Sequence, residues 1–388
     1  MSKSNRFHRG KIKKTRNIYL DYASGAKPNT SSIHALGVKA KKELETARRD
    51  VALVLKARPE DIIFTSGGTE SNNLAIQGVV LNFWELNKKL SHLITTNIEH
   101  PSVLETCKML ERRGLVELVI VSVEKNGIID PKKIKKEIKK NTVLVSVMYA
   151  NNEIGTIQPI RDIAKEIRHY RKIENSQFPF FHTDAVQVVN YLDLNVEVLG
   201  VDILSLSGSK IEESGRVGVL FRKKNVFLSS ILGGGDQEMG LRPGTENLAE
   251  IIKFSKALQK AESTKQKETK RLTKLRDYFM SRMPLDRVVV NGDLKERLPN
   301  NVNITFAKIP SELLVIELSI YGIMASSKSA CKSSQKGGSY VIQAINPELD
   351  PEIGGVRFSL GRDTTKKDID YTVKILMHVL SKLSEWYK

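Results

Sequence analysis

The sequence has few cysteines, few aromatic residues and no long apolar run, and these shortages exclude several classes of protein. Its 388 residues include two cysteines, far apart, so no disulfide framework is expected. No stretch is apolar enough to cross a bilayer as a helix, and we expect neither a secretory leader nor a membrane anchor, hence a cytoplasmic protein. With 40% hydrophobic and 27% charged residues, the composition is that of a globular chain with one large core and a second lobe.

Acidic residues are also in short supply, since 44 Asp and Glu face 62 Lys and Arg, for a net charge of +18. Such an excess attracts polyanions, nucleic acid included. The basic residues lie mainly in helix-like stretches such as 131–140, without a recognition motif or interleaved aromatic residues. We interpret the charge as diffuse, and we expect nucleic-acid binding to be at most weak and non-specific.

Residues 1–16 contain seven Lys or Arg and no acid. We expect them to form a disordered basic arm. The alternative is a mitochondrial presequence, which would need an apolar helical face that Phe7 and Ile12 hardly supply.

From residue 17 to about 224, short apolar runs alternate with amphipathic helical stretches. The runs that we predict as strands are 62–65, 93–96, 118–123, 143–148, 178–182, 202–206 and 217–221. Most lack an alternation of polar and apolar residues, which is typical of strands covered on both faces. Helical stripes occur at 36–54 and at 160–167, the second behind Pro159 at a plausible first-turn position. The order predicts an α/β fold with a doubly wound, mostly parallel sheet.

The glycine run 233–235 interrupts this rhythm. A long charged helix at 247–283 follows, then short strands near 288–291 and 303–306 and a final amphipathic helix at 369–383. These elements predict a smaller α+β domain. We therefore divide the chain into the arm 1–16, a large domain at 17–255 and a small domain at 256–388. No internal repeat is present.

Polar clusters follow several predicted strands, and in open α/β sheets ligands bind where strands end. Residues 66–73 read Ser-Gly-Gly-Thr-Glu-Ser-Asn-Asn. Glycines and hydroxyls at a helix start suit a phosphate, although ordinary helix capping explains them equally well, and the Gly-Lys-Ser/Thr of a Walker loop is missing. Asp184 could pair with a protonated ring nitrogen, and the flat ring of His100 could stack on a planar cofactor, unless it is only a cap or core residue.

Two further residues suggest covalent chemistry in two parts. Lys210 ends the run 202–210 and could hold an aldehyde cofactor as a Schiff base. Cys331, in the polar loop 326–334, could take a group from the activated substrate. Taken singly, a strand-end lysine is usually a solvated charge and a loop cysteine is often idle. Cys107 shares a helical stripe with Val103 and Leu110, which predicts a buried core thiol.

As a set, these residues resemble the cysteine desulfurases of the NifS/IscS type, which are class-V aminotransferase relatives with the fold-type-I architecture of pyridoxal-phosphate enzymes. The resemblance runs from Ile18 to Tyr371, nearly the whole chain. The matching stretches are 18–21, 64–71, 99–100, 151–155, 182–187, 241–247, 329–331 and 356–362. Together they cover both predicted domains.

The resemblance implies pyridoxal 5'-phosphate as cofactor, L-cysteine as substrate and no metal. Lys210 would bind the cofactor aldehyde, Asp184 the pyridine nitrogen, and His100 would stack on the ring and move protons. The remaining cofactor contacts would come from Gly68, Thr69, Gln187, Ser207 and Ser209, with Thr245 reaching over from the second subunit of a homodimer. Asn151 and Arg357 would hold the substrate carboxylate. Cys331 would become a persulfide and pass its sulfur to an acceptor protein, for iron–sulfur cluster assembly or tRNA thiolation.

Some positions depart from the family pattern. Ser209 stands where a histidine is usual, Glu212 and Glu213 replace the usual Gly-Pro turn, and Lys328 and Lys332 flank the cysteine. Three alternatives stay open: a selenocysteine lyase, another class-V aminotransferase-like enzyme, and a degenerate homologue that binds a partner without catalysis. A transaminase has no need of a loop thiol, and the persistence of Lys210, Asp184 and Cys331 speaks against degeneration.

Overall fold

The computed structural model describes residues 18–284, 288–306, 308–327 and 338–384. The predicted basic arm therefore lies outside the described residues, and so does Cys331. Among the helices within these ranges, none combines the length and the apolar character that a membrane crossing requires.

A seven-stranded sheet lies at the centre of the large lobe. Its strands are β1 (Ile62–Thr65), β2 (Ser91–Thr96), β3 (Val116–Val121), β4 (Thr142–Ser146), β5 (Phe180–Asp184), β6 (Ile203–Ser207) and β7 (Gly218–Arg222). The spatial order is β1-β7-β6-β5-β4-β2-β3. Strands β2 to β6 pair in parallel, whereas β7 is antiparallel to both of its neighbours. The predicted α/β fold with a mostly parallel sheet is confirmed.

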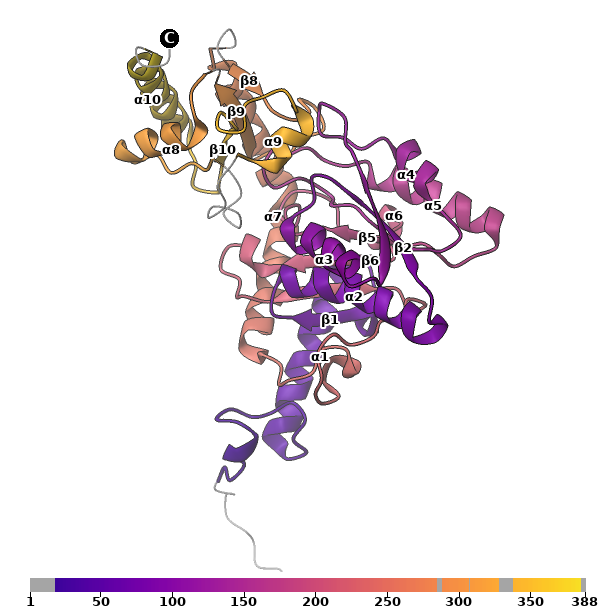
Figure 1. The fold of residues 1–388 in the computed structure, drawn as a ribbon. Helices are drawn as coiled ribbons and strands as arrows, with labels where there is room; N and C mark the ends of the chain where they lie inside the picture. The colour runs from indigo at the N-terminus through magenta and orange to yellow at the C-terminus, as the bar shows by residue number, and fades with distance from the viewer. Residues whose placement is uncertain (1–17, 285–287, 307, 328–337, 385–388) are drawn as a thin grey trace, which may run out of the picture.

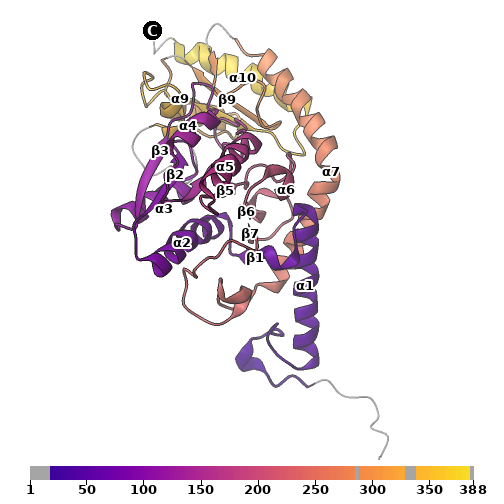
Figure 2. The ribbon, with the colours of Figure 1, turned by 90° about the vertical axis from the view of Figure 1, so that its right-hand side faces the viewer.

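Both faces of this sheet are buried except at the edge strand β3, where Glu117 and Ile120 are exposed, and this burial explains why most of the strands show no polar–apolar alternation. Along β1, Ile62 and Phe64 enter one core and Ile63 enters the other. Helices α2 (Gly68–Asn87) and α3 (Pro101–Arg112) cover the second core. The first is covered by α1 (Ala35–Leu55), α4 (Pro131–Glu137), α5 (Ile160–Glu174), α6 (Val196–Leu199) and the first half of α7 (Leu248–Ser281). Figures 1 and 2 show α1 beside α7 along one side of the molecule.

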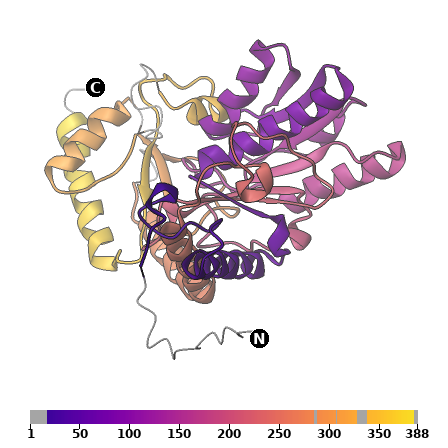
Figure 3. The same ribbon diagram turned by 90° about the horizontal axis from the view of Figure 1, so that it is seen from below.

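The small lobe has a sheet of its own. Strands β8 (Val288–Val290), β9 (Asn301–Phe306) and β10 (Val356–Ser359) form an antiparallel sheet in the order β10-β9-β8. Helices α8 (Ser311–Ile320) and α10 (Lys366–Ser384) pack with it in a separate core. Figure 3 shows this orange and yellow lobe to one side of the purple and magenta large lobe.

Two elements connect the lobes. Helix α7 places Phe254 and Leu258 in the larger core and Leu272 and Phe279 in the smaller one. Helix α9 (Tyr340–Ile345) comes late in the chain, yet its apolar residues complete the larger core. The division at residue 255 falls inside α7 and stays a proposal.

Candidate functional site

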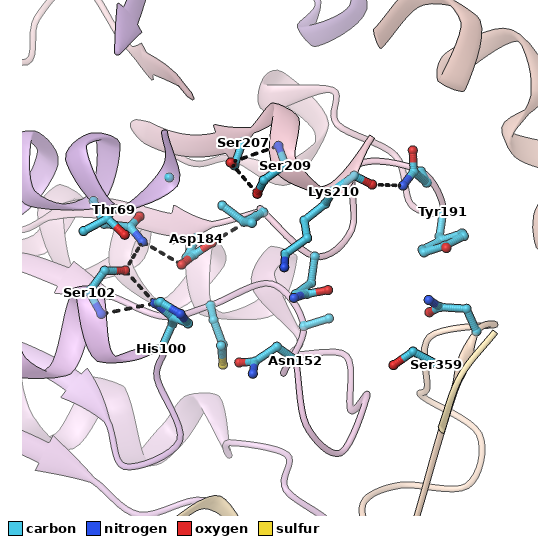
Figure 4. A pocket seen from close by; sticks show the side chains of 18 of the residues that line it. Thr69, His100, Ser102, Asn152, Asp184, Tyr191, Ser207, Ser209, Lys210 and Ser359 are labelled. Carbon is cyan, nitrogen blue, oxygen red and sulfur yellow. Dashed lines mark hydrogen bonds between the residues drawn. The ribbon is translucent and has the colours of Figure 1, made fainter. Parts of the chain in front are cut away.

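A pocket of about 410 Å³ opens at the carboxyl ends of the parallel strands. Its walls come from the residues that follow β1, β2, β4, β5 and β6, and from β10 of the small lobe. Figure 4 shows side chains from both lobes converging on it. The predicted residues Gly68, Thr69, His100, Asp184, Gln187, Ser207, Ser209, Lys210 and Arg357 all line this pocket.

One wall is the start of α2. The first backbone N–H groups of a helix have no partner within it, so Gly68 and Thr69 offer donors and the positive end of a 20-residue helix. A Cβ at Gly68 would lie 2.8 Å from Cγ2 of Val186 and 3.3 Å from Cβ of Ser207, so any other residue would require these neighbours to shift. Ser207 accepts a hydrogen bond from the Ser209 N–H at 3.3 Å, and the two hydroxyls lie 3.0 Å apart. This corner suits an anion.

His100 sits at the start of α3, where Pro101 takes the first helical position. Its Nδ1 accepts the backbone N–H of Ser102 at 3.1 Å and lies 2.8 Å from the Ser102 hydroxyl. The pKa of His100 is lowered, chiefly by burial; the Asp184 charge opposes this shift and the Lys210 charge adds to it. The imidazole is therefore neutral at physiological pH.

Asp184 is the last residue of β5 and is almost buried. Its Oδ1 accepts the N–H of Val186 at 3.0 Å, and its Oδ2 accepts Nδ2 of Asn72 at 2.7 Å. Two donors from separate segments thus fix the orientation of the carboxylate.

Lys210 ends a single 3-10 turn, Gly208–Lys210, directly after β6. Its backbone carbonyl accepts Nδ2 of Asn190 at 2.6 Å, which fixes the base of the side chain. Figure 4 shows the lysine amine directed into the pocket. An amine held in this way is available for covalent chemistry with a carbonyl compound.

Arg357 of β10 supplies the cation of the opposite wall. Its Nη1 donates to the backbone oxygen of Asn152 at 2.9 Å, whereas its buried Nε has no partner among the described residues. Burial lowers the pKa of Arg357, although nearby Glu153 opposes the shift. Asn152 and Asn300 each have a buried side-chain oxygen that also lacks a partner in the described chain. Unsatisfied buried polar groups are costly, so this wall is suited to a polar ligand. The Arg357 Nε can donate to a carboxylate, and the two amide oxygens can accept from a donor such as an amine.

Two predicted site residues, Asn151 and Thr245, do not line the pocket, and a third cannot be placed. The buried amide of Asn151 donates to the Ile98 carbonyl at 2.8 Å and accepts two backbone N–H groups of its own loop, while the neighbouring Asn152 lines the pocket. Thr245 is exposed and is not part of the pocket wall of its own chain. Cys331 lies outside the described residues. The roles given to these three residues stay predictions.

The pocket also contains polar residues that the sequence did not single out: Asn72, Ser102, Asn152, Asn190, Tyr191, Asn300 and Ser359. Asn72 follows Gly68 by one helical turn, so helical periodicity could have identified it. Asn300 and Ser359 belong to the small lobe and enter through tertiary packing, for which the sequence gives no local signal.

The two acids that replace the usual turn after Lys210 each form an ion pair. One pairs with an arginine of the small lobe and the other with a lysine of α7. Glu212 lies 3.2 Å from Arg362, and Glu213 lies 2.8 Å from Lys260. Neither acid lines the main pocket. The departure from the family pattern therefore does not add negative charge to the pocket wall.

Comparison with known proteins agrees with this geometry. Residues 10–372 match the family described as Aminotransferase class-V. A cysteine desulfurase IscS of Dictyoglomus turgidum is 41% identical over 387 residues, which cover 95% of each chain. A solved NifS-like protein superposes with a TM-score of 0.83 at 33% identity, over 92% of each chain. A structure described as SspA in complex with cysteine gives a TM-score of 0.72 at 31% identity, over 86% of this chain and 90% of that one.

Proposed function

The chain belongs to the aminotransferase class-V family and, within it, to the cysteine desulfurases, and on that premise we propose how its own residues perform the reaction. The substrate is L-cysteine, and the products are L-alanine and a persulfide on Cys331. The observation that supports this most directly is the pocket in which Lys210, Asp184, His100 and Arg357 meet.

The pocket fits pyridoxal 5'-phosphate. The α2 N-terminus, where Gly68 leaves room beside Val186 and Ser207, and the hydroxyls of Ser207 and Ser209 form a cradle for the phosphate. Asp184 would hold the ring nitrogen, and Lys210 would bind the aldehyde. When bound, this cofactor withdraws electrons from the α-carbon of an amino acid and so makes its bonds easier to break.

Arg357 would bind the substrate carboxylate, since its buried Nε still has a hydrogen to donate. Asn152, with its unsatisfied oxygen beside this guanidinium, is suited to orient the same substrate. The charges of Asp184 and Lys210 both act on the neutral His100 ring. A neutral imidazole has one N–H to donate and one lone pair to accept a proton, so His100 can move protons within the site.

In the sulfur-transfer step, the thiolate of Cys331 attacks the substrate sulfur. An S–S bond forms and the substrate C–S bond breaks; its electron pair remains on the carbon, which takes up a proton and becomes the methyl group of alanine. The substrate carbon is reduced and the two sulfur atoms are oxidised, so no external oxidant is needed. The persulfide then passes to an acceptor protein that serves iron–sulfur cluster assembly or tRNA thiolation. A cytoplasmic location suits this step, because a reducing compartment keeps acceptor thiols free.

The proposal further includes a homodimer, in which exposed Thr245 of each chain would complete the phosphate site of the other. The segment before α1 exposes the large apolar side chains of Leu20 and Ile33 to solvent. Exposed apolar side chains of this size are typical of an interface with another chain, which supports the dimer.

The test is the release of alanine and sulfide from L-cysteine in the presence of a reductant, together with mass spectrometry of the persulfide. Cys331→Ser should keep the fold and cysteine binding but lose sulfide release and the persulfide. Cys107→Ser is the matched control: this thiol is fully buried on α3, where burial raises its pKa and leaves it unreactive, so turnover should persist. Sulfide release by Cys331→Ser at the wild-type rate would rule out the persulfide step.

A further inference from the structure

A chain of hydrogen bonds joins Asp184 to His100 through two residues that the proposed chemistry leaves unused, Asn72 and Ser102. Nδ2 of Asn72 donates to Oδ2 of Asp184 at 2.7 Å and to the Ser102 hydroxyl at 2.8 Å. The Ser102 hydroxyl and backbone N–H then reach Nδ1 of His100 at 2.8 and 3.1 Å. Figure 4 draws the contacts of Asp184, Ser102 and His100 as dashed lines at one side of the pocket.

The chemistry of the groups fixes the direction of every bond in this chain. An amide NH₂ only donates, so the Ser102 hydroxyl accepts from Asn72 and its one proton remains for Nδ1 of His100. The backbone N–H of Ser102 also only donates, and therefore Nδ1 must present its lone pair. If the Asn72 amide were rotated so that Oδ1 and Nδ2 changed places, Oδ1 would face the Asp184 carboxylate. Both groups accept hydrogen bonds and neither has a proton to donate, so this orientation is unfavourable.

We propose that Asn72 and Ser102 are positioning residues, which hold His100 as a neutral imidazole with its proton on Nε2 and hold Asp184 as an acceptor. The edge of the ring remote from Ser102 then carries an N–H. His100 therefore enters the reaction as a proton donor, and it can act as a base only after this proton has left. The catalytic meaning of this arrangement rests on the proposed function, whereas the hydrogen bonds do not.

The charges around His100 agree with a neutral ring. Asp184 after β5 favours the imidazolium, Lys210 after β6 disfavours it, and burial disfavours it most. The neighbouring carboxyl, Glu99, is buried, and its pKa is raised, so it contributes little negative charge at neutral pH. A proton on Nδ1 would also break the hydrogen bond that caps the first turn of α3.

The tautomer can be measured directly by NMR of the full chain as purified, with ¹⁵N-labelled histidine and long-range ¹H–¹⁵N correlations. The chain has seven histidines, and His100→Gln identifies the signal of interest. We expect a neutral ring protonated at Nε2 at neutral pH, and a titration at lower pH than that of a free histidine. A ring protonated at Nδ1, or an imidazolium at neutral pH, would overturn the proposal.

Two variants test the positioning residues. In Asn72→Asp, the Ser102 hydroxyl can turn to the new carboxylate, and the added charge should raise the pKa of His100 by about one pH unit or more. Ser102→Ala removes one of the two donors to Nδ1 and should raise the pKa in the same direction, so it serves if the first variant does not fold. The matched control is Asn73→Asp, one residue along α2, where the amide donates to the Thr69 carbonyl instead. A pKa of His100 unchanged in both test variants, or raised equally in the control, would contradict the role.

This readout needs no turnover. If the protein releases no sulfide but His100 has the expected tautomer and shifts, the proposed function fails and the positioning role stands. If the protein releases sulfide but His100 has the other tautomer, the proposed function stands and the positioning role fails.

Discussion

At the scale of single residues, the most unusual environment belongs to Glu99. The side chain is completely buried, and one of its oxygens accepts the Thr96 hydroxyl at 2.7 Å and the Met148 N–H at 2.9 Å. The other oxygen has no partner among the described residues. Burial, with a smaller contribution from the Asp184 charge, raises the pKa of Glu99 to about 8. At neutral pH this residue is a neutral acid directly before His100.

The raised pKa predicts how stability depends on pH. Between its ordinary value of 4.5 and about 8, the folded chain keeps a proton that the unfolded chain has lost. This contribution to the free energy of unfolding is complete below the ordinary pKa and declines as pH rises, by about 1.4 kcal/mol per pH unit within that window. Glu99→Gln keeps the shape without the titration, so denaturant unfolding at several pH values should show its advantage over the wild type growing with pH. The control is Glu111→Gln at an exposed position of α3, whose free energy of unfolding should change with pH as that of the wild type does. If the free energy of Glu99→Gln also followed the wild type at every pH, Glu99 would not have a raised pKa.

The residues of the pocket show what a sequence can and cannot reveal. His100, Asp184 and Lys210 could be predicted because each lies at the end of a buried strand or shortly after it, and strand ends meet at one edge. Asn72 meets Asp184 across 112 residues of chain, and Asn300 arrives from the other lobe, so no local pattern indicates either contact. Asn151 and Asn152 are identical neighbours in one loop, but the amide of Asn151 is buried in the protein interior and Asn152 lines the pocket. The sequence alone does not indicate which of the two faces the pocket.

At the scale of elements, a buried ion pair fixes the loop between β7 and α7. Arg48 of α1 binds both carboxylate oxygens of Glu238, at 2.8 and 2.7 Å, and Glu238 also accepts the backbone N–H of Phe64 at 2.8 Å. Glu238 and Met239 both have positive backbone φ angles, of 47° and 61°, which residues other than glycine rarely adopt. The ion pair therefore holds a strained turn at the start of the segment that leads to Thr245.

Two acids on the same arginine give a matched test of this anchor. Glu238 is almost fully buried, whereas Glu45 reaches Arg48 at 3.4 Å with 44% of its side chain exposed. Glu238→Gln leaves a buried guanidinium without its buried counter-charge and should lower the free energy of unfolding by about 3–5 kcal/mol. Glu45→Gln should lower it by less than about 1 kcal/mol. Equal losses in urea unfolding would show that the pair does not anchor the loop.

Element types could be predicted more reliably than element ends. The run 178–182 was expected as a strand, but β5 covers Phe180–Asp184. Pro179 has no N–H for a sheet, so the strand begins after it, and Asp184 becomes its last residue. Similarly, Pro159 is the N-cap of α5 and not a first-turn residue. Such shifts depend on single hydrogen bonds, which hydrophobic periodicity does not register.

At the scale of the whole molecule, the proposed homodimer predicts that defective chains can complement each other. In a mixture of Lys210→Ala and Thr245→Ala chains, one site of each mixed dimer would contain both an intact lysine and an intact threonine. Mixing equal amounts after mild dissociation should therefore restore tight pyridoxal-phosphate binding in one site of each mixed dimer, about one site in four of the whole mixture, with a dimeric mass by light scattering. A chain that carries both substitutions is the control and should rescue neither parent. A fully active monomer would contradict the dimer.

The charge of +18 makes a second prediction at this scale. Many of the basic side chains are paired on the surface, as Lys133 is with Glu124 and Lys135 with Glu166. We expect weak binding to tRNA that falls steeply with salt and is abolished by heparin, because diffuse charge recognises phosphate and not sequence. Fluorescence anisotropy across a salt series measures this. Selective binding of particular tRNAs that persists at physiological salt would reveal a dedicated surface.

The placement of α9 has a consequence for the order in which the protein can fold during its synthesis. Val341, Ile342 and Ile345 fill the same core as residues of α1, which the ribosome makes about three hundred residues earlier. That core cannot close until α9 has emerged, so most of the nascent chain must wait with apolar surface uncovered. Chaperones that shield nascent chains should therefore matter more for this protein than for one whose first lobe closes on its own.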